Sequence, residues 1–486
     1  MSDSKNSLKK LNKRTEISRR EVIASGAALA TTAGMLSSLS HELRAESKGI
    51  NKNMSSIQAP YDSLRDYVNA LEESGSLKIF DGVNQDKYEG TAIMYQLIDE
   101  FGLRNAPAVL LRNVIIDGKN VKGPIVANFQ GPMITEAMLL GTKNYDENPK
   151  QTYRDATSTM LELLRKTEGE WPEIAPREIA ADVAPCKQNI LRGGEIDMTK
   201  FAFIKGNPGD GGRYINTASV VTSDPDLGGN YGIYRCQLKG PRKIMINFED
   251  GQTGKKMIDA ALKRGETKMK IALVVGQDPM TFMISCSRIP SRIGRRDPID
   301  ELAVAGGLRG KAIDVVKTED QNFLVPANAE MIIEGTFDLL NLEPEGPYHE
   351  MYGYLGHPKP KNYVMTVETL THRTDPWIIN SFTGVVQEYI SAPQRAESNY
   401  RLQQSSPQVV DYHSPHESQG ITFMSIKKDA AKQALKIARP TAMFNPLSRI
   451  VIVVDEDVDV LDTQAVLFAL GSRWQPALAS EIIENR

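Results

Sequence analysis

The stretch Glu345-Gly-Pro-Tyr-His-Glu350-Met-Tyr-Gly-Tyr354 sets two carboxylates five residues apart around a Gly-Pro turn. Because Gly346 and Pro347 exclude a regular helix here, helical spacing cannot be assumed for the two carboxylates. A turn can still aim both into one pocket, where the three flanking tyrosines would partly shield them from water. Such surroundings let one carboxyl work as a general acid near neutral pH. The alternative is a polar loop with two solvated glutamates.

Length and composition indicate an ordinary globular protein. The 486 residues suffice for two or three domains and a large buried core. Apolar residues make up 41% and charged residues 24% of the chain. The net charge of -3 gives no basic surface that would argue for a nucleic-acid partner. Cys186, Cys236 and Cys286 are odd in number and far apart, so they form neither a zinc pattern nor a disulfide framework.

The N-terminus indicates export. Residues 1–20 carry seven Lys and Arg and end in Arg19-Arg20, and a weakly apolar run rich in Ala and Gly follows over 22–39. This layout is typical of a bacterial twin-arginine signal, and the run is too polar for a stable membrane span. We therefore expect residues 1–55 to be signal and flexible linker, and the protein to be periplasmic. The alternative is a basic, flexible tail on a cytoplasmic protein.

The rest of the chain is predicted to be a multidomain protein of mixed α+β and α/β character. In the N-terminal region, over 56–185, apolar periodicity predicts helices that begin near Leu64 and span 151–166. Many short strands between Gly, Asp and Pro turns follow over 186–370, which favours a barrel or a sandwich. The strands expected there cover residues 214–222, 231–237, 244–246, 271–275 and 280–285.

An α/β layer is expected again over 371–486. The pattern predicts a helix over 427–438 closed by Pro440, a buried strand over 450–454 and a helix over 460–470. Acidic residues follow the buried strand in the loop that contains Asp455, Asp457 and Asp459. They resemble a metal site, but a solvated loop at a strand end is the preferred interpretation.

Further polar residues are candidates for the site. If 231–237 is a strand, Arg235 and Gln237 share a face with Ile233, and an inward arginine needs an anionic partner such as a phosphate, a substrate carboxylate or Glu345. The glycine-rich segment 206–212 either lets backbone amides approach a phosphate or is a plain turn. The pair Asp300-Glu301 either complements a helix dipole or supplies an oxygen ligand to a hard cation.

Five stretches, in their order and at their separations, resemble the UbiD family of reversible decarboxylases, which use prenylated FMN. The resemblance covers about residues 60 to 480 and rests on Asn230-x-Gly-Ile-Tyr-Arg235-x-Gln237, Asp300-Glu301-Leu-Ala-x-Ala-Gly-Gly-Leu-Arg309, Val325-Pro-Ala-x-Ala-Glu330-x-x-x-Glu334-Gly335, Glu345-Gly-Pro-Tyr-x-Glu350-x-x-Gly-Tyr354 and Ser425-Ile-Lys-Lys428. It implies an N-terminal α/β region, a central split β-barrel that holds the flavin, and a C-terminal α/β domain used in oligomerisation.

The resemblance also assigns roles. The family's catalytic network falls on Arg235, Glu345 and Glu350, with Glu350 as proton donor. The expected reaction is the non-oxidative decarboxylation of an aromatic or α,β-unsaturated acid. The cofactor would be contacted by the side chains or backbone of Asn230, Ile233, Tyr234, Arg235, Gln237, Glu301 and Lys428. The resemblance further implies a flavin prenyltransferase as cofactor supplier and a homodimer or larger homo-oligomer.

A divalent metal, Mn or Mg, is expected to bridge the cofactor phosphate through Asn230 and Glu301, and K+ is a further candidate ion. Family members commonly add a histidine, but the corresponding region 248–253 has none, so Asp250 or Gln252 is the expected substitute. Relatives also continue past the position of Arg486 with an apolar segment over the active site. These departures motivate a second hypothesis, a non-catalytic flavin-binding relative. A third is an unrelated exported enzyme with a carboxylate pair, such as a glycoside hydrolase.

Overall fold

The computed structural model describes residues 58–142, 148–287, 300–385, 391–445 and 447–484, which belong to a unit spanning Asn53–Arg486. The predicted export signal, over residues 1–55, lies outside the described residues. Among the described helices, none has both the length and the apolar content that crossing a membrane requires.

The N-terminal region is built on a four-stranded sheet in the order β1-β2-β5-β18. Its elements are α3 (Leu64–Glu73), β1 (Leu77–Asp81), α4 (Glu89–Phe101), β2 (Ala108–Arg112), β5 (Ile125–Ala127), α5 (Ile134–Leu140) and α6 (Pro149–Lys166), with a small hairpin of β3 (Ile115–Ile116) and β4 (Lys119–Asn120). The two predicted helices are confirmed as α3 and α6. The strand β18 (Ile378–Ile379) returns from much later in the chain to pair with β5. The predicted domain boundaries near residues 185 and 370 stay predictions.

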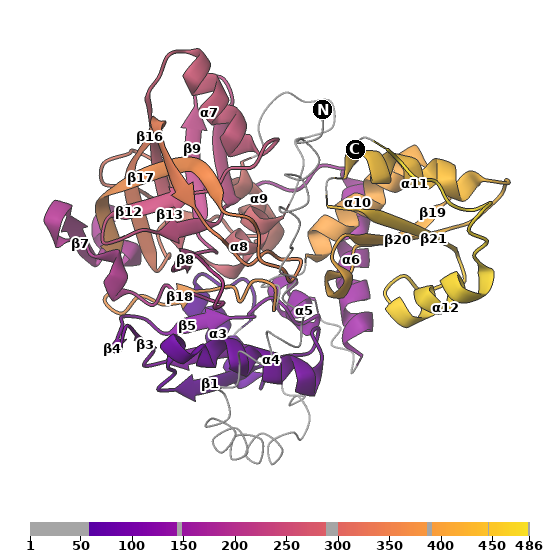
Figure 1. Cartoon of the computed structure of the whole chain (residues 1–486), viewed down its shortest axis with the longest axis horizontal. Helices are drawn as coiled ribbons and strands as arrows, with labels where there is room; N and C mark the ends of the chain where they lie inside the picture. Colours follow the sequence, from indigo (N-terminus) through magenta and orange to yellow (C-terminus); the bar gives the residue numbers. More distant parts are fainter. Residues whose placement is uncertain (1–57, 143–147, 288–299, 386–390, 446, 485–486) are drawn as a thin grey trace, which may run out of the picture. The chain divides into compact units, whose positions relative to one another are not determined.

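The central region holds a nine-stranded sheet in which all the pairings are antiparallel. The order along its path is β10-β9-β13-β16-β17-β12-β11-β8, and β7 also pairs with β17. Figure 1 shows its long strands β16 and β17 side by side, with the helix α7 (Thr253–Lys263) near β9. The strands are β7 (Asn189–Arg192), β8 (Tyr214–Ile215), β9 (Ser219–Asp224), β10 (Gly228–Ile233), β11 (Cys236–Leu238), β12 (Lys243–Ile246), β13 (Lys268–Val275), β16 (Met331–Glu345) and β17 (Lys359–His372).

This sheet is strongly curled, because consecutive strands lie near its two opposite ends. The strand β10 is one end of the path, whereas β11 is next to the other end, yet only Tyr234 and Arg235 separate them. Three residue steps span at most about 11 Å of extended chain. The two ends of the sheet must therefore approach each other, as expected for a split barrel, and Arg235 lies in the connection between them.

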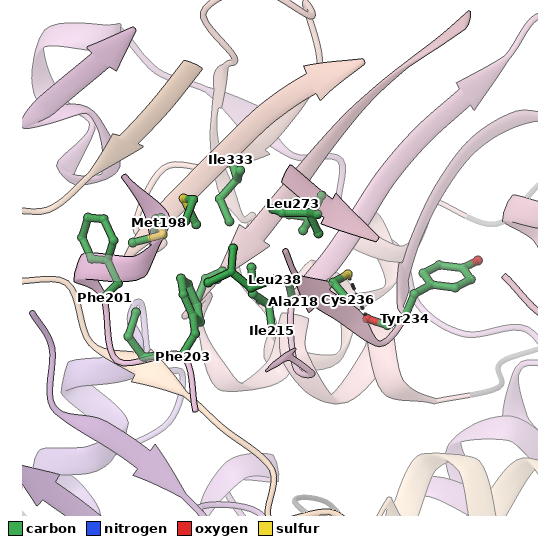
Figure 2. Packing of buried hydrophobic residues seen from close by; sticks show 14 of the residues in the cluster. Met198, Phe201, Phe203, Ile215, Ala218, Tyr234, Cys236, Leu238, Leu273 and Ile333 are labelled. Carbon is green, nitrogen blue, oxygen red and sulfur yellow. Dashed lines mark hydrogen bonds between the residues drawn. The ribbon is translucent and has the colours of Figure 1, made fainter. Parts of the chain in front are cut away.

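The alternation of side chains along these strands creates two apolar faces. Val220, Leu273 and Ile333 point into one core cluster, while their neighbours Val274 and Ile332 belong to a second. Figure 2 shows Leu273 and Ile333 beside Met198, Ile215 and Leu238 in the first cluster. The second cluster includes side chains of the helices α8 (Pro279–Cys286) and α9 (Glu301–Arg309). A smaller sheet joins β6 (Arg177–Glu178), β14 (Asp314–Lys317) and β15 (Leu324–Pro326).

The C-terminal region is a three-stranded sheet with helices on both faces. Phe423 and Val454 pack with residues of α12, whereas Met424 and its neighbours pack with residues of α10 and α11. The elements, visible in Figure 1, are α10 (Ala392–Ser405), β19 (Val409–His413), β20 (Ile421–Ile426), α11 (Gln433–Phe444), β21 (Ile450–Asp455) and α12 (Thr463–Arg473).

Several predictions of secondary structure and burial are wrong in detail, including the strand expected over 214–222, which is divided into β8 and β9. Residues 280–285 form the helix α8 rather than a strand, since Asp278 caps its first turn and Pro279 takes the first helical position. The predicted strand 231–237 is interrupted at Tyr234 and Arg235, where the chain crosses from one end of the sheet to the other. The helix expected over 427–438 begins at Gln433 and runs past Pro440. The strand β21 is mostly half-buried rather than buried.

Candidate active site

The stretch Glu345–Tyr354 begins at the end of one of the two longest strands of the central sheet and continues into the turn that leads to the other. The strand β16 ends at Glu345 and β17 begins at Lys359, so the intervening turn carries Glu350. The Gly346–Pro347 peptide bond is cis, and an isolated bridge joins His349 to Leu355 within the turn. The backbone of Glu350 is held as well, because its amide donates to the Tyr354 carbonyl at 2.8 Å.

Arg235 binds both carboxylates of the stretch. Its Nε and Nη2 atoms donate to the two oxygens of Glu345 at 3.2 and 2.8 Å, a bidentate pair. Its Nη1 atom donates to Oε1 of Glu350 at 2.5 Å. The structure therefore brings the predicted trio together, and it resolves the partner that the sequence left open for Arg235.

The two carboxylates have different surroundings. Glu345 is 1% exposed, and both its oxygens are occupied. Arg235 donates to each of them, and the Tyr214 hydroxyl also donates to Oε1 at 3.0 Å. Glu350 is 29% exposed, and its Oε2 atom accepts no hydrogen bond from the described residues. Glu345 is thus a fixed anchor for Arg235, whereas Glu350 is partly exposed and is held by Arg235 through one oxygen.

The tyrosines of the stretch shield the site unequally. Tyr348 is buried, its ring centroid lies 5.1 Å from the Arg235 guanidinium carbon, and burial raises its pKa to about 12. Tyr352 and Tyr354 stack on each other instead, and Tyr354 is 53% exposed. Burial, and next the Glu345 carboxylate, raise the pKa of Tyr214, so its hydroxyl stays a donor. Of the three tyrosines of the stretch, Tyr348 alone is buried as expected. Tyr214, from elsewhere in the chain, is also buried beside Glu345.

The glycine-rich segment 206–212 supports the carboxylate turn. The Gly211 amide donates to the Pro347 carbonyl at 2.7 Å, and Oδ1 of Asp210 accepts the His349 amide at 2.7 Å. Asp210 is buried, and burial raises the pKa of its carboxyl. Sequence reasoning identified this segment as a phosphate loop or a plain turn and missed its contact with the turn at 346–349. The composition of the segment gave no signal for that contact.

Gly211→Ala is expected to disrupt the site. A Cβ atom at this position would lie 2.2 Å from the Gly346 carbonyl oxygen, so the backbone beside Glu345 must move. We expect overpacking to cost about 1–3 kcal/mol of stability and to lower turnover by more than about tenfold, since small displacements of positioned groups are costly. Gly194→Ala, where nothing lies within 4 Å of the added carbon, is the matched control. Equal turnover in the two variants would show that the contact does not position the turn.

Two of the predicted metal ligands, Asn230 and Glu301, lie at the same strand, β10. The Nδ2 atom of Asn230 donates to Thr222 and Tyr234, which leaves its amide oxygen available. The Glu301 carboxylate interacts with the backbone of Tyr231, next to Asn230, and burial raises its pKa to about 7. An amide oxygen beside a carboxylate without a cationic partner suits a hard cation. Within the described residues there is no group of three or more His, Cys, Asp or Glu side chains that could hold a metal ion.

The remaining predicted metal ligand and the predicted lysine contact, Asp250 and Lys428, are both exposed residues. Asp250 is an exposed residue in the turn before α7 (Thr253–Lys263), and Gln252 accepts the Glu249 amide within that turn at 2.8 Å. Lys428, predicted to contact the cofactor, is exposed and pairs with Asp455 of β21 at 3.5 Å. Asp250 as a ligand and Lys428 as a cofactor contact stay predictions.

The remaining predicted cofactor contacts line the connection around Arg235. Ile233 packs partly buried against the second core cluster. Tyr234 belongs to the first core cluster, and its hydroxyl accepts the Gly254 amide at 3.2 Å. Figure 2 shows it beside Cys236, whose Sγ atom contacts the Tyr234 carbonyl. Gln237 is fully buried; its side-chain oxygen Oε1 accepts the Gly346 amide at 2.9 Å, and its Nε2 atom finds no partner among the described residues.

The aspartates in the acidic loop of the C-terminal region form ion pairs with arginine side chains. Asp457 pairs with Arg473 at 2.7 Å, and Asp459 pairs with Arg154 at 2.7 Å. Both pairs are partly exposed, which agrees with the preferred interpretation of a solvated loop rather than a metal site.

Comparisons with known proteins identify the family. Residues 177–386 match the 3-octaprenyl-4-hydroxybenzoate carboxy-lyase Rift-related domain, and residues 388–486 match the C-terminal domain of the same enzyme. Together the matches cover more than half of the chain. An uncharacterized protein of Aeropyrum pernix is 32% identical over 297 residues, which span 59% of each chain.

Solved structures give the same result. The vanillic acid decarboxylase of Sedimentibacter hydroxybenzoicus, in its open form, is 25% identical with a TM-score of 0.70, covering 86% of this chain and 85% of that one. An evolved dimeric form of the UbiD-class enzyme HmfF from Pelotomaculum thermopropionicum, in complex with prFMN, is also 25% identical, with a TM-score of 0.71 and coverage of 86% and 91%. The chain belongs to the UbiD family.

Proposed function

We propose that the protein is a carboxy-lyase that removes CO2 without oxidation from an aromatic or α,β-unsaturated carboxylic acid, with Glu350 as proton donor. The observation that carries this proposal is the asymmetry around Arg235. Glu345 is buried with both oxygens occupied, whereas Glu350 is held through one oxygen, and its other oxygen has no hydrogen-bond partner in the part of the chain that the structure describes. A positioned carboxyl with a free oxygen is what proton delivery to a carbon atom requires.

Each residue of the site has a different role. Arg235 is fixed by Glu345 and in turn holds Glu350 at a defined position. Its guanidinium also attracts an incoming substrate carboxylate toward the donor. Burial of Tyr214 and Tyr348 around the trio limits the access of water. Glu350 then delivers its proton to the carbon atom that has lost CO2.

The residues present fit prenylated FMN and its divalent ion. Gln237 keeps a buried donor that has no partner among the described residues, and Asn230 and Glu301 would supply oxygen ligands to a divalent ion. When bound, the cofactor supplies the electron sink that no side chain provides for decarboxylation. The HmfF structure described above contains prFMN.

The experiment that tests this function measures CO2 release. The protein is co-expressed with a flavin prenyltransferase, its bound cofactor is identified by mass spectrometry, and a panel of aromatic and unsaturated acids is offered. We expect at least one acid to release CO2 in proportion to cofactor content. Bound cofactor without CO2 release from any acid would instead favour a non-catalytic flavin-binding relative, and no flavin at all would contradict both.

The metal proposal makes its own prediction. Glu301→Ala removes the one carboxylate among the two clustered ligands, so we expect metal content and cofactor occupancy to fall together. Elemental analysis and flavin absorbance of the purified variant measure the two quantities. Asp300→Ala is a useful comparison, since Asp300 caps the same helix through the Leu302 and Ala303 amides. Unchanged metal in Glu301→Ala would place the ion elsewhere.

Export is proposed from the sequence alone. Arg19→Lys combined with Arg20→Lys should keep the protein in the cytoplasm of a bacterial host, because the paired arginines are the feature recognised by this route. Fractionation followed by immunoblotting measures the distribution. Periplasmic recovery equal to that of the unmodified chain would mean that the segment is a basic tail and not a signal.

A homodimer or larger homo-oligomer is also proposed. Large apolar side chains are exposed on α12 and the residues that follow it, namely Leu467, Phe468, Trp474, Leu478 and Ile482. Contiguous exposed apolar surface is typical of an interface. The oligomer stays a prediction that the native mass of the protein in solution decides.

A further inference from the structure

Tyr214 contacts the carboxylate turn from a strand that is distant in the sequence. It is the first residue of β8, and its side chain is buried. Its hydroxyl lies within hydrogen-bond distance of two acceptors, Oε1 of Glu345 at 3.0 Å and the Pro347 carbonyl at 3.3 Å. A phenol has one hydrogen atom to donate, so the two acceptors share it. The hydroxyl therefore spans the end of β16 and the start of the turn that carries Glu350.

The ring of Tyr214 is held independently of its hydroxyl. Its centroid lies 4.4 Å from that of Tyr348, whose ring in turn lies 5.1 Å from the Arg235 guanidinium carbon. The backbone of Tyr214 pairs with Gln237 of β11, and its amide donates to the Ile204 carbonyl at 2.9 Å. Loss of the hydroxyl alone should therefore leave the ring in place.

Other charged and titratable groups lie around Glu345 and Tyr214 on several elements. They are Arg235 and Cys236 in and after the strand connection, Asp210 in the glycine-rich segment, Glu350 in the turn, and Glu249 and Lys359, which pair with each other at 2.7 Å. Burial raises the pKa of the Cys236 thiol, so this group stays neutral. Among the described residues, Arg235 and Tyr214 are the two whose side chains donate to the Glu345 carboxylate.

The position of a single proton distinguishes the two glutamates. Both carboxyl groups bind the same guanidinium, so a proton taken up by the pair can reside on either of them. Tyr214 donates to Glu345 and not to Glu350. Because a hydrogen bond donated to an ionised carboxylate is stronger than one donated to a neutral acid, this contact favours the state in which Glu345 is ionised and Glu350 is protonated.

We propose that Tyr214 is a positioning residue that keeps Glu345 ionised and thereby leaves the transferable proton on Glu350. Its consequence for turnover rests on the proposed function, in which Glu350 is the proton donor. Its physical content is the protonation of Glu345, which is measurable whether or not the protein turns over an acid.

The first test follows the protonation of Glu345 by infrared spectroscopy over a pH titration of the cofactor-loaded protein. The titration is done in the Glu350→Gln variant, where Glu345 is the remaining carboxyl of the pair, and its bands are identified by their absence from the variant that also carries Glu345→Gln. We expect Tyr214→Phe to raise the pH at which Glu345 takes up its proton by about one unit or more, as loss of a charge-assisted hydrogen bond implies. An unchanged pH would overturn the inference.

The second test measures kcat against pH for Tyr214→Phe in the otherwise unmodified protein. If Glu345 must be ionised, the acidic limb of the profile should move to higher pH by the same amount, which lowers turnover by about tenfold on the acidic side. Flavin absorbance should match that of the unmodified protein. A variant that only packs less well would lose the same factor at every pH, with the limb unmoved.

Two comparisons separate the hydroxyl from the ring. Tyr67 is also buried and donates its hydroxyl to the Phe129 carbonyl at 3.0 Å, so Tyr67→Phe removes a similar hydrogen bond from α3 and should leave the acidic limb unchanged. Replacement of Tyr214 by 4-aminophenylalanine supplies an N–H donor at the same place, so it should restore the limb in part. Identical profiles for Phe and 4-aminophenylalanine would show that the donor has no role.

The outcomes also separate this inference from the proposed function. An infrared shift in Tyr214→Phe without CO2 release from any acid would sustain the role of Tyr214 and contradict the decarboxylase. CO2 release with an unchanged infrared titration would sustain the decarboxylase and leave Tyr214 as a packing residue.

Discussion

Glu350→Gln is expected to lower turnover by about 10²-fold or more while the cofactor stays bound. The amide keeps the shape of the side chain and can still accept the hydrogen bond from Arg235 Nη1, but it has no transferable proton. Since the variant changes neither the buried anchor Glu345 nor the residues around Asn230, flavin absorbance should match that of the unmodified protein. Steady-state CO2 release from the best substrate of the panel measures the effect.

A matched control is available on β16, the strand that ends at Glu345. Glu343 lies two residues before Glu345 on β16 and pairs with Lys243 at the surface, away from the trio. Glu343→Gln should therefore leave turnover unchanged. If Glu350→Gln retained near-normal turnover, the proton would have to come from another group, and the asymmetry of the two carboxylates would not be catalytic.

Arg235→Met should remove activity and also destabilise the protein. It leaves Glu345 buried with a negative charge, and the Tyr214 hydroxyl is then its one hydrogen-bond partner among the residues that the structure describes. Breaking a buried ion pair from one side costs about 3–5 kcal/mol, because the remaining charge is uncompensated. The thermal unfolding midpoint of the variant should fall clearly below that of the unmodified protein.

Two comparisons make this prediction sharp. Arg177→Met breaks an ion pair with Asp314 whose arginine is 67% exposed, and it should leave the unfolding midpoint almost unchanged. The double variant Arg235→Met with Glu345→Leu removes both buried charges, so it should recover much of the lost stability but none of the activity. An unfolding midpoint in Arg235→Met as high as in Arg177→Met would mean that Glu345 is not an uncompensated buried charge.

The sequence predicted which residues form the site better than it predicted the different surroundings and roles of the two carboxylates. Arg235, Glu345 and Glu350 were identified because five motifs occur together, in order and at the expected separations, and the structure places Arg235 in direct contact with both glutamates. Their spacing alone does not show which carboxylate is buried. That difference depends on Tyr214, which lies 131 residues from Glu345 in the chain and donates to it.

Long-range contacts also explain what was missed. Residues 206–212 look like any glycine-rich turn, and their function depends on the close approach of Gly211 to Gly346, which no local pattern encodes. The helix α8 was mistaken for a strand because all of its residues except Cys286 are buried, so it shows no amphipathic period. The capping residue Asp278 and the following Pro279 were the signal available for a helix.

The curled central sheet was predicted correctly, and its key detail lies at the interrupted strand. A continuous strand over 231–237 would place Arg235 and Gln237 on one face by alternation. In the structure the chain changes ends of the sheet at Tyr234 and Arg235 instead. The arginine reaches both carboxylates from this connection, and Gln237 supports Gly346 from β11.

The most direct test of the central claim is decarboxylation in D2O without oxygen. The cofactor-loaded protein is given the best acid of the panel, and CO2 and product are quantified together by mass spectrometry. Non-oxidative decarboxylation with an exchangeable carboxyl donor predicts one deuterium per product molecule, at the carbon that carried the carboxylate, and one CO2 for each product. A product that forms only when oxygen is supplied, or one without deuterium at that carbon, would contradict the account.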